Sequence, residues 1–121
     1  MNEILTQEKS IYIQISEMIE NDILRGVLLE EENVPSTTEL SKLYALNPAT
    51  AAKGVNILVD AGILYKKRGI GMFVAEGAKE MILNRRRGEF YDQFIKKLLQ
   101  EAASIGLGKE EIIKMISQAD E

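Results

Sequence analysis

The sequence predicts a mainly α-helical protein with one small β-hairpin, followed by a helical tail. Apolar residues recur every three or four positions over most of the chain, as they do on the buried face of a helix. Two short stretches rich in β-forming residues flank a basic, glycine-containing connection between residues 63 and 74. Residues 76–105 then return to the helical pattern and contain no proline.

The N-terminal part predicts one helix, which residues 11–25 form and Gly26 ends. The apolar run at residues 27–29 predicts a short strand, and residues 30–33 predict a turn. This turn contains three adjacent glutamates, which could suggest a cation site. A solvated turn is the better interpretation, so we predict no metal.

Two helices with well-defined starts follow. Ser36 and Glu39 have the spacing of a capping box, which satisfies two backbone N–H groups at the start of a short helix. Asn47 and the proline after it mark the start of a second helix over residues 48–61. Gly54 within this helix costs about 1 kcal/mol relative to alanine, so we expect another segment to pack closely against it.

The hairpin and the tail complete the chain. Residues 63–65 and 72–74 predict its two strands. In the tail, Gly88 is expected to interrupt the helical pattern and residues 105–108 to break it, before a final helix at 109–118. The tail stripe consists of Phe90, Phe94, Leu98, Ala102 and Ile105.

The composition excludes several classes of function. The chain has neither cysteine nor histidine, which excludes disulfides, thiolate or histidine metal sites and histidine-dependent catalysis. An enzyme would have to rely on carboxylates, lysine or tyrosine, so we predict no enzymatic activity and no cofactor. There is no signal peptide and no apolar run near the roughly 18 residues of a membrane span, so a cytoplasmic location is expected.

The net charge of −4 argues against a nucleic-acid partner, but its distribution favours one. Residues 34–75 carry five basic against two acidic residues, whereas residues 1–33 carry two against eight. The basic excess therefore surrounds the helix at 48–61, and a phosphate backbone would interact with this local charge.

The order of helices, tight turn and hairpin is that of a winged helix-turn-helix. The second helix of that motif enters the major groove of DNA with its N-terminal end leading. Small residues at Ala49, Thr50 and Ala52 would let the helix backbone approach base edges and phosphates. The helix N-terminus itself also favours an anion.

Residues 11–75 resemble the DNA-binding domain of the GntR family of bacterial transcriptional regulators. The resemblance rests on an ordered set of motifs: IYIQI at 11–15, Val34-Pro35-Ser36, Glu39-Leu40, Asn47-Pro48-x-Thr50, Ala61-Gly62-Ile63-Leu64 and Arg68-Gly69-x-Gly71-Met72-Phe73-Val74. The Asn-Pro-x-Thr motif and the short tail resemble the YtrA-type subfamily. This resemblance implies a homodimeric repressor that binds double-stranded DNA at an inverted-repeat operator, with a DNA-binding domain at 1–75 and a helical dimerisation tail at 76–121.

The same resemblance implies a set of DNA-binding residues: Ser36, Thr37 and Thr38, then Asn47, Thr50 and Lys53 on the recognition helix, and Lys67, Arg68, Gly69 and Gly71 in the wing. Three departures from the family pattern stand out. Thr38 replaces the usual arginine, Ala49 and Ala52 replace bulkier polar residues, and the usual glycine near Glu31 is missing. The first two predict lower affinity or altered specificity.

Two alternatives remain open at this stage. The tail stripe could pack on its own domain, although we expect a partner subunit to cover it, because so short a tail encloses little core alone. The winged helix could also be a protein-interaction module without specific DNA binding, which the overall acidity and Thr38 favour. Any small-molecule effector would bind at the dimer seam or between tail and wing, and no residue identifies such a ligand.

Overall fold

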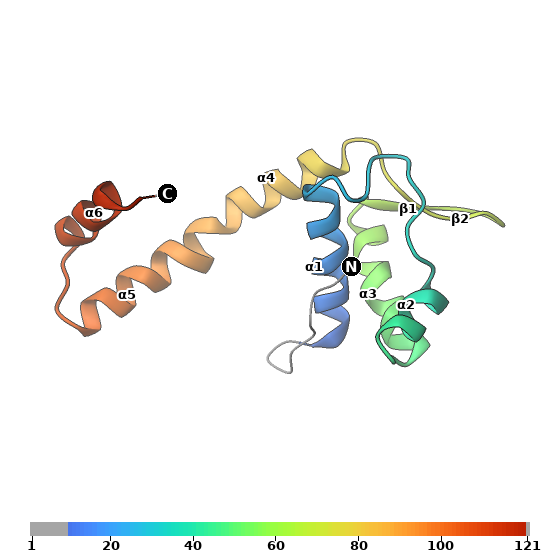
Figure 1. Cartoon of the computed structure of the whole chain (residues 1–121), viewed down its shortest axis with the longest axis horizontal. Helices are drawn as coiled ribbons and strands as arrows, with labels where there is room; N and C mark the ends of the chain where they lie inside the picture. Colours follow the sequence, from blue (N-terminus) through green and yellow to red (C-terminus); the bar gives the residue numbers. More distant parts are fainter. Residues whose placement is uncertain (1–9, 121) are drawn as a thin grey trace. The chain divides into compact units, whose positions relative to one another are not determined.

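A computed structural model describes residues 10–120, which fold mainly into helices with one antiparallel hairpin, as predicted (Figure 1). The chain divides between Leu83 and Asn84 into two units. The elements are α1 (Ile11–Leu24), α2 (Thr37–Leu43), α3 (Pro48–Asp60), β1 (Leu64–Lys67), β2 (Gly71–Val74), α4 (Ala78–Phe90), a π-helical turn η1 (Tyr91–Ile95), α5 (Lys96–Ser104) and α6 (Lys109–Gln118).

The core of the first unit forms around α3, which packs against α1, α2 and β1. Figure 1 shows α3 between the other two helices, with the hairpin leaving its C-terminal end. Burial of large aliphatic side chains is the main stabilising contribution in such a core. Its most deeply buried large residues are Ile15, Ile19, Leu40, Leu58, Leu64, Val74 and Ile82.

Gly54 lies where α3 packs tightly against α1, which confirms the expected close packing. A Cβ atom at this position would lie 2.7 Å from the carbonyl oxygen of Tyr12 and 2.9 Å from Cβ of Ile15. Real Cβ atoms essentially never approach backbone this closely. The glycine lowers the helix propensity of α3, but only a residue without a side chain allows α1 and α3 to pack this closely.

The strand predicted at residues 27–29 is wrong. The backbone N–H groups of Val27 and Leu28 instead donate to the carbonyl oxygen of Asp22, at 2.8 and 3.1 Å. These bonds close the C-terminal end of α1, with Gly26 in the left-handed conformation at φ 78°. The apolar run therefore serves to terminate a helix, and its donors are not available to a sheet.

The segment that pairs with the hairpin lies a few residues later. The N–H of Glu31 donates to the Val74 carbonyl at 2.7 Å, and the N–H of Val34 donates to the Met72 carbonyl at 2.9 Å. The N–H of Val74 donates back to Glu32 at 3.0 Å. A third extended segment thus borders β2, a support that an isolated two-stranded hairpin lacks.

Two turns use left-handed backbone without glycine. Ala45, between α2 and α3, has φ 53°, and Glu31 has φ 69°. An L-residue in this conformation costs roughly 1–2 kcal/mol because its Cβ crowds the following carbonyl. The Glu31 carboxylate accepts a hydrogen bond from the Tyr65 hydroxyl, which raises the pKa of Tyr65. The missing family glycine near Glu31 therefore leaves the turn in place, with a side-chain contact added.

The second unit consists of helices. Gly88 does not interrupt them, so that prediction is wrong: α4 continues through Gly88 to Phe90 and on into η1 and α5. A single exposed glycine costs a helix about 1 kcal/mol, which its neighbours outweigh. The predicted break is confirmed, because the chain leaves the helix after Ser104 and α6 begins at Lys109. Within residues 10–120, no helix is both long and apolar enough to span a membrane.

Candidate nucleic-acid interface

The start of α2 is fixed by the predicted capping box. The N–H of Glu39 donates to Ser36 Oγ, and the N–H of Ser36 donates to Glu39 Oε1, both at 3.0 Å. The backbone hydrogen bond from Ser36, followed by that from its side chain, lowers the pKa of Glu39. Ser36 and Thr38 are exposed and Thr37 is half-buried. The cap thus presents three hydroxyl side chains at one helix end.

The start of α3 is open to an approaching ligand. Asn47 Oδ1 accepts a hydrogen bond from the N–H of Ala49 at 2.8 Å, which makes Asn47 the N-cap. Asn47, Ala49 and Lys53 are exposed, and Thr50 is half-buried. The cap uses the oxygen of the Asn47 amide, and its Nδ2 group can donate to a further acceptor. The small side chains leave the positive end of the helix dipole accessible.

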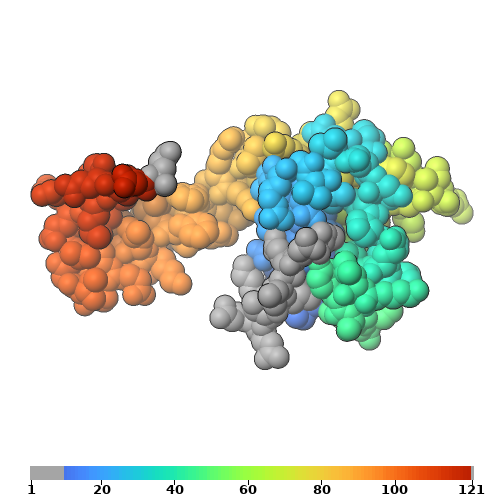
Figure 2. All heavy atoms as spheres, in the orientation of Figure 1, coloured from blue at the N-terminus to red at the C-terminus, as the bar shows by residue number. Residues whose placement is uncertain are grey.

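The hairpin tip is shorter than the sequence indicated. Lys67 pairs with Gly71 across the strands, so the strands include part of the predicted connection. Only residues 68–70 remain in the loop, where the N–H of Ile70 donates to the Lys67 carbonyl at 3.0 Å. Gly69 has φ 78°, which permits this tight turn. Arg68 and Ile70 are exposed at a tip that projects from the first unit (Figure 2).

Gly71 lies at the base of this tip, with φ 149°. A Cβ atom there would lie 3.1 Å from Oδ1 of Asn33. The glycine therefore lets the hairpin bend close to the preceding extended segment, as well as keeping the tip narrow.

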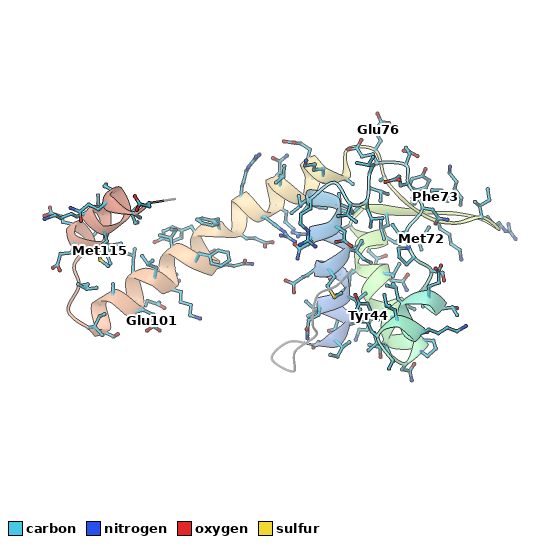
Figure 3. All side chains as sticks on the ribbon, in the orientation of Figure 1. Tyr44, Met72, Phe73, Glu76, Glu101 and Met115 are labelled. Atoms are coloured by element: carbon cyan, nitrogen blue, oxygen red, sulfur yellow. The ribbon has the colours of Figure 1, made fainter. Side chains whose placement is uncertain are left out.

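Aromatic rings support two of the predicted lysines. Lys53 Nζ lies 4.0 Å from the ring centroid of Tyr12. On the hairpin, Lys67 Nζ lies 4.3 Å from the ring of Phe73, which Figure 3 labels on β2, and 5.8 Å from that of Tyr65. Sequence reasoning missed Tyr12 as a neighbour of Lys53, because the two residues belong to different helices and share no motif.

The predicted tail residues differ in exposure. The rings of Phe90 and Phe94 lie 5.2 Å apart, and both are exposed, as are Leu98 and Ile105. Ala102 is buried, so its methyl group is already covered within the chain. Among the residues that the structure describes, no group of three or more acidic side chains could hold a metal ion.

Comparison with known proteins identifies this arrangement. The family model of bacterial regulatory proteins of the gntR family matches residues 11–74, from the first turn of α1 to the end of β2. The chain belongs to the GntR family. Members of this family are transcriptional regulators and not enzymes, and the winged helix-turn-helix of the first unit is their DNA-binding domain.

Individual relatives place this GntR chain in the short YtrA-type subfamily. It is 28% identical to the HTH-type transcriptional repressor YtrA of Bacillus subtilis over 108 residues, which cover 89% of this chain and 82% of YtrA. The crystal structure of a putative GntR-family regulator from Bacteroides thetaiotaomicron superimposes with a TM-score of 0.71 at 35% identity, covering 89% of this chain and 94% of that one.

The DNA-binding part also resembles a protein solved with DNA. The AraR DNA-binding domain in complex with operator ORX1 matches with a TM-score of 0.53 at 30% identity. The match covers 62% of this chain and 92% of the AraR chain. A chain that resembles more than half of this GntR protein has thus been solved in complex with an operator.

Proposed function

We propose that this chain is a sequence-specific, homodimeric repressor of the cytoplasm that binds an inverted-repeat operator in double-stranded DNA. The open N-terminal turn of α3 carries this proposal. There an exposed cap, Asn47, and the small residue Ala49 leave the positive helix end accessible to a phosphate. The relative YtrA of Bacillus subtilis is a repressor, and AraR has been solved on an operator, which supports the same role here.

The DNA contacts divide into three groups by chemistry. Hydroxyls at the start of α2 donate to phosphate oxygens, and the wing contributes charge at Lys67 and Arg68, while Gly69 and Gly71 keep its backbone slim. On α3, Thr50 and the Asn47 amide reach toward the groove, and Lys53 binds phosphate. The hydroxyl group consists of Ser36, Thr37 and Thr38.

Direct base readout on this surface rests on few side chains. Ala49 and Ala52 offer only methyl groups, which contact the thymine methyl but form no hydrogen bonds with bases. Thr38 provides a short hydroxyl where the family usually has an arginine. We therefore expect much of the specificity to come from the shape of the DNA and the spacing of its half-sites.

Dimerisation follows from the exposed side chains of the tail. We propose that residues 1–75 bind DNA and that residues 76–121 form the dimer contact, in which Phe90, Phe94, Leu98 and Ile105 face a second copy and Ala102 shapes the helix beneath them. A two-fold dimer presents its recognition helices to two half-sites of an inverted repeat.

The test is fluorescence anisotropy with a labelled duplex from upstream of the protein's own gene, compared with a scrambled duplex at two salt concentrations. We expect tighter binding to the native duplex, with an affinity that falls steeply as salt rises. Arg68→Ala should weaken binding severalfold and reduce the salt slope by about 1. Lys114→Ala removes an exposed lysine of α6 that is not among the proposed dimer-contact side chains; it is the matched control and should change neither.

The same experiment separates the alternative function. Equal, weak and salt-insensitive association with both duplexes would contradict operator binding. It would favour a protein-interaction module, because an apolar protein interface depends little on salt. Unchanged affinity of the Arg68→Ala variant, with specific binding retained, would contradict only the assignment of the wing.

A further inference from the structure

Tyr12, on the first turn of α1, lies against the side chain of Lys53 on α3. Lys53 Nζ is 4.0 Å from the centroid of the ring, well within the roughly 6 Å over which a ring face attracts a cation. We propose that Tyr12 is a positioning residue that holds the Lys53 ammonium group in place for a DNA phosphate. This inference rests on the proposed function and adds to it a residue from outside the helix-turn-helix.

Gly54 explains how the ring reaches its place. It follows Lys53 directly, and a Cβ atom at Gly54 would lie 2.7 Å from the carbonyl oxygen of Tyr12. The backbone of Tyr12 is thus in contact with α3 one residue from the lysine that its ring supports. The glycine sets the distance between the helices, and this distance brings the ring within reach of the ammonium group.

An aromatic ring has an advantage over a carboxylate as a support for Lys53. A carboxylate would hold the ammonium group but cancel its charge, and with it the attraction to phosphate. The Tyr12 ring is neutral, so the positive charge remains available while the lysine loses part of its rotamer freedom before binding. Less side-chain entropy is then lost when the DNA binds.

The wing contains a second lysine that lies against an aromatic ring. Lys67 Nζ lies 4.3 Å from the ring of Phe73 and 5.8 Å from that of Tyr65. Two lysines proposed to bind phosphate, on separate elements, thus rest on aromatic faces. The recurrence favours a role in orienting cationic side chains over a chance contact of one exposed lysine.

A double-mutant cycle tests the role of Tyr12. Binding of the full chain to the labelled upstream duplex is measured for Tyr12→Leu, Tyr12→Phe, Lys53→Gln and the Tyr12→Leu/Lys53→Gln pair, with thermal melting as a check on folding. We expect Tyr12→Leu to weaken binding by about 2- to 5-fold, the range of an exposed cation–π contact. Tyr12→Phe keeps the ring and should bind within about 2-fold of the unmodified protein.

The decisive comparison is the effect of Tyr12→Leu in the two backgrounds. If Tyr12 acts through Lys53, Tyr12→Leu has no further effect once Lys53 is glutamine. An equal loss in both backgrounds would overturn the proposal, because Tyr12 would then act on DNA or on folding by itself. Unchanged affinity of Tyr12→Leu in the unmodified background would overturn it as well.

A measurement without DNA distinguishes this failure from failure of the proposed function. The ring should shift the NMR signals of the Lys53 side-chain methylene next to Nζ, and Tyr12→Leu should remove that shift while Tyr12→Phe retains it. Absence of the shift would overturn the support of Lys53 by Tyr12. If the shift is present but the unmodified protein does not bind DNA, the proposed function fails, and the role of Tyr12 in DNA binding fails with it.

Discussion

The two units of the chain use the same residue type at helical spacing with opposite results. In α1, Ile15 and Ile19, four residues apart, are both 0% exposed, whereas in α6 Ile113 is 54% and Ile116, three residues later, is 62% exposed. Within the described part of that unit, only Ala102 and Ile112 have buried side chains. The spacing of apolar residues thus identifies a helix face that is suited to burial. Whether that face is buried within the chain depends on the other elements that pack against it.

This difference is what the proposed dimer would explain. In the first unit, α3 is surrounded by two helices and a strand, so its apolar face is closed inside the chain. The second unit has three consecutive helical segments and one short final helix, and its aromatic side chains remain in water. A second copy of the chain would supply the missing surface at low cost, because the same patch is present on both subunits.

The largest expected effect is on the tail. Leu98→Asp introduces a charge into the proposed dimer contact, where both subunits would have to bury an ionised carboxylate. We expect the dissociation constant of the dimer to rise at least about 100-fold, equivalent to about 2.7 kcal/mol. The affinity for DNA should fall in parallel. Light scattering at micromolar concentration would measure the change.

The matched control for this variant is Gln100→Asp, which adds the same charge to an exposed position of α5 outside the apolar stripe. It should leave the oligomeric state unchanged. If the Leu98→Asp variant remains a dimer, the exposed face of the tail is not the contact, and the comparison between the units loses its explanation.

The next effect compares two glycines, one in each unit. Gly54→Ala forces a methyl group against the Tyr12 carbonyl and should lower the free energy of unfolding by about 2 kcal/mol. Gly88→Ala meets no atom within 4 Å and should raise helix stability by about 0.5–1 kcal/mol. Urea denaturation measures the change in the free energy of unfolding for both variants. A change of the same sign in both would contradict the difference in packing.

A smaller effect is expected in the turn of the helix-turn-helix. Ala45 has φ 53°, so Ala45→Gly should relieve crowding and stabilise the first unit by roughly 0.5–1 kcal/mol after the extra flexibility of glycine is deducted. Ala61→Gly makes the same chemical change at φ −80° and should destabilise the chain. Equal melting temperatures of the two variants would show that the turn at Ala45 carries no strain.

The smallest effect concerns the helix starts. The lowered pKa of Glu39 means that its stabilisation of α2 is complete above the ordinary value of 4.5 and is lost as the pH falls through the folded-state pKa. Glu39→Gln keeps a capping amide but has no proton to gain, so it should remove this part of the pH dependence. Thermal melts between pH 7 and pH 3 measure the melting temperature of the unmodified protein and of Glu39→Gln. The difference between the two should shrink as the pH falls.

The corresponding change in the second unit is Glu111→Gln. Glu111 accepts a hydrogen bond from the N–H of Gly108 at 3.5 Å, and Gly108 has no side chain to complete the capping box. We therefore expect it to lower the melting temperature at pH 7 less than Glu39→Gln does. A larger change would indicate that the cap of α6 is tighter in solution than this distance suggests.

Local signals in the sequence predicted the helix starts well. Ser36 with Glu39, and Asn47 with the proline after it, act within a single turn, so the residues that decide the structure are adjacent in the chain. The same holds for the hairpin. At Gly54 the glycine itself predicted that another segment packs closely, but its partner, Tyr12 on α1, is distant in the chain and was not predicted. The fold class, the family and the subfamily could all be predicted from such short-range patterns in series.

Features that a single local pattern does not decide could not be predicted in this way. The apolar run at residues 27–29 fits a strand by itself, and only its bonds to Asp22 show that it ends α1. Gly88 fits a helix break, yet the surrounding helix continues through it. The contact between Tyr12 and Lys53 joins α1 to α3, and no spacing within either helix reveals it.

The extended segment beside β2 has a consequence for how fast and how often an encounter with DNA succeeds. Hydrogen bonds at Glu31, Val34 and Val74 tie the base of the wing to the loop before α2, so in the proposed complex the hairpin would meet DNA already oriented. A loosely attached wing would have to find its groove after the recognition helix had docked, and many encounters would dissociate first. If the wing is already held in place, it and the recognition helix can dock on DNA in the same encounter.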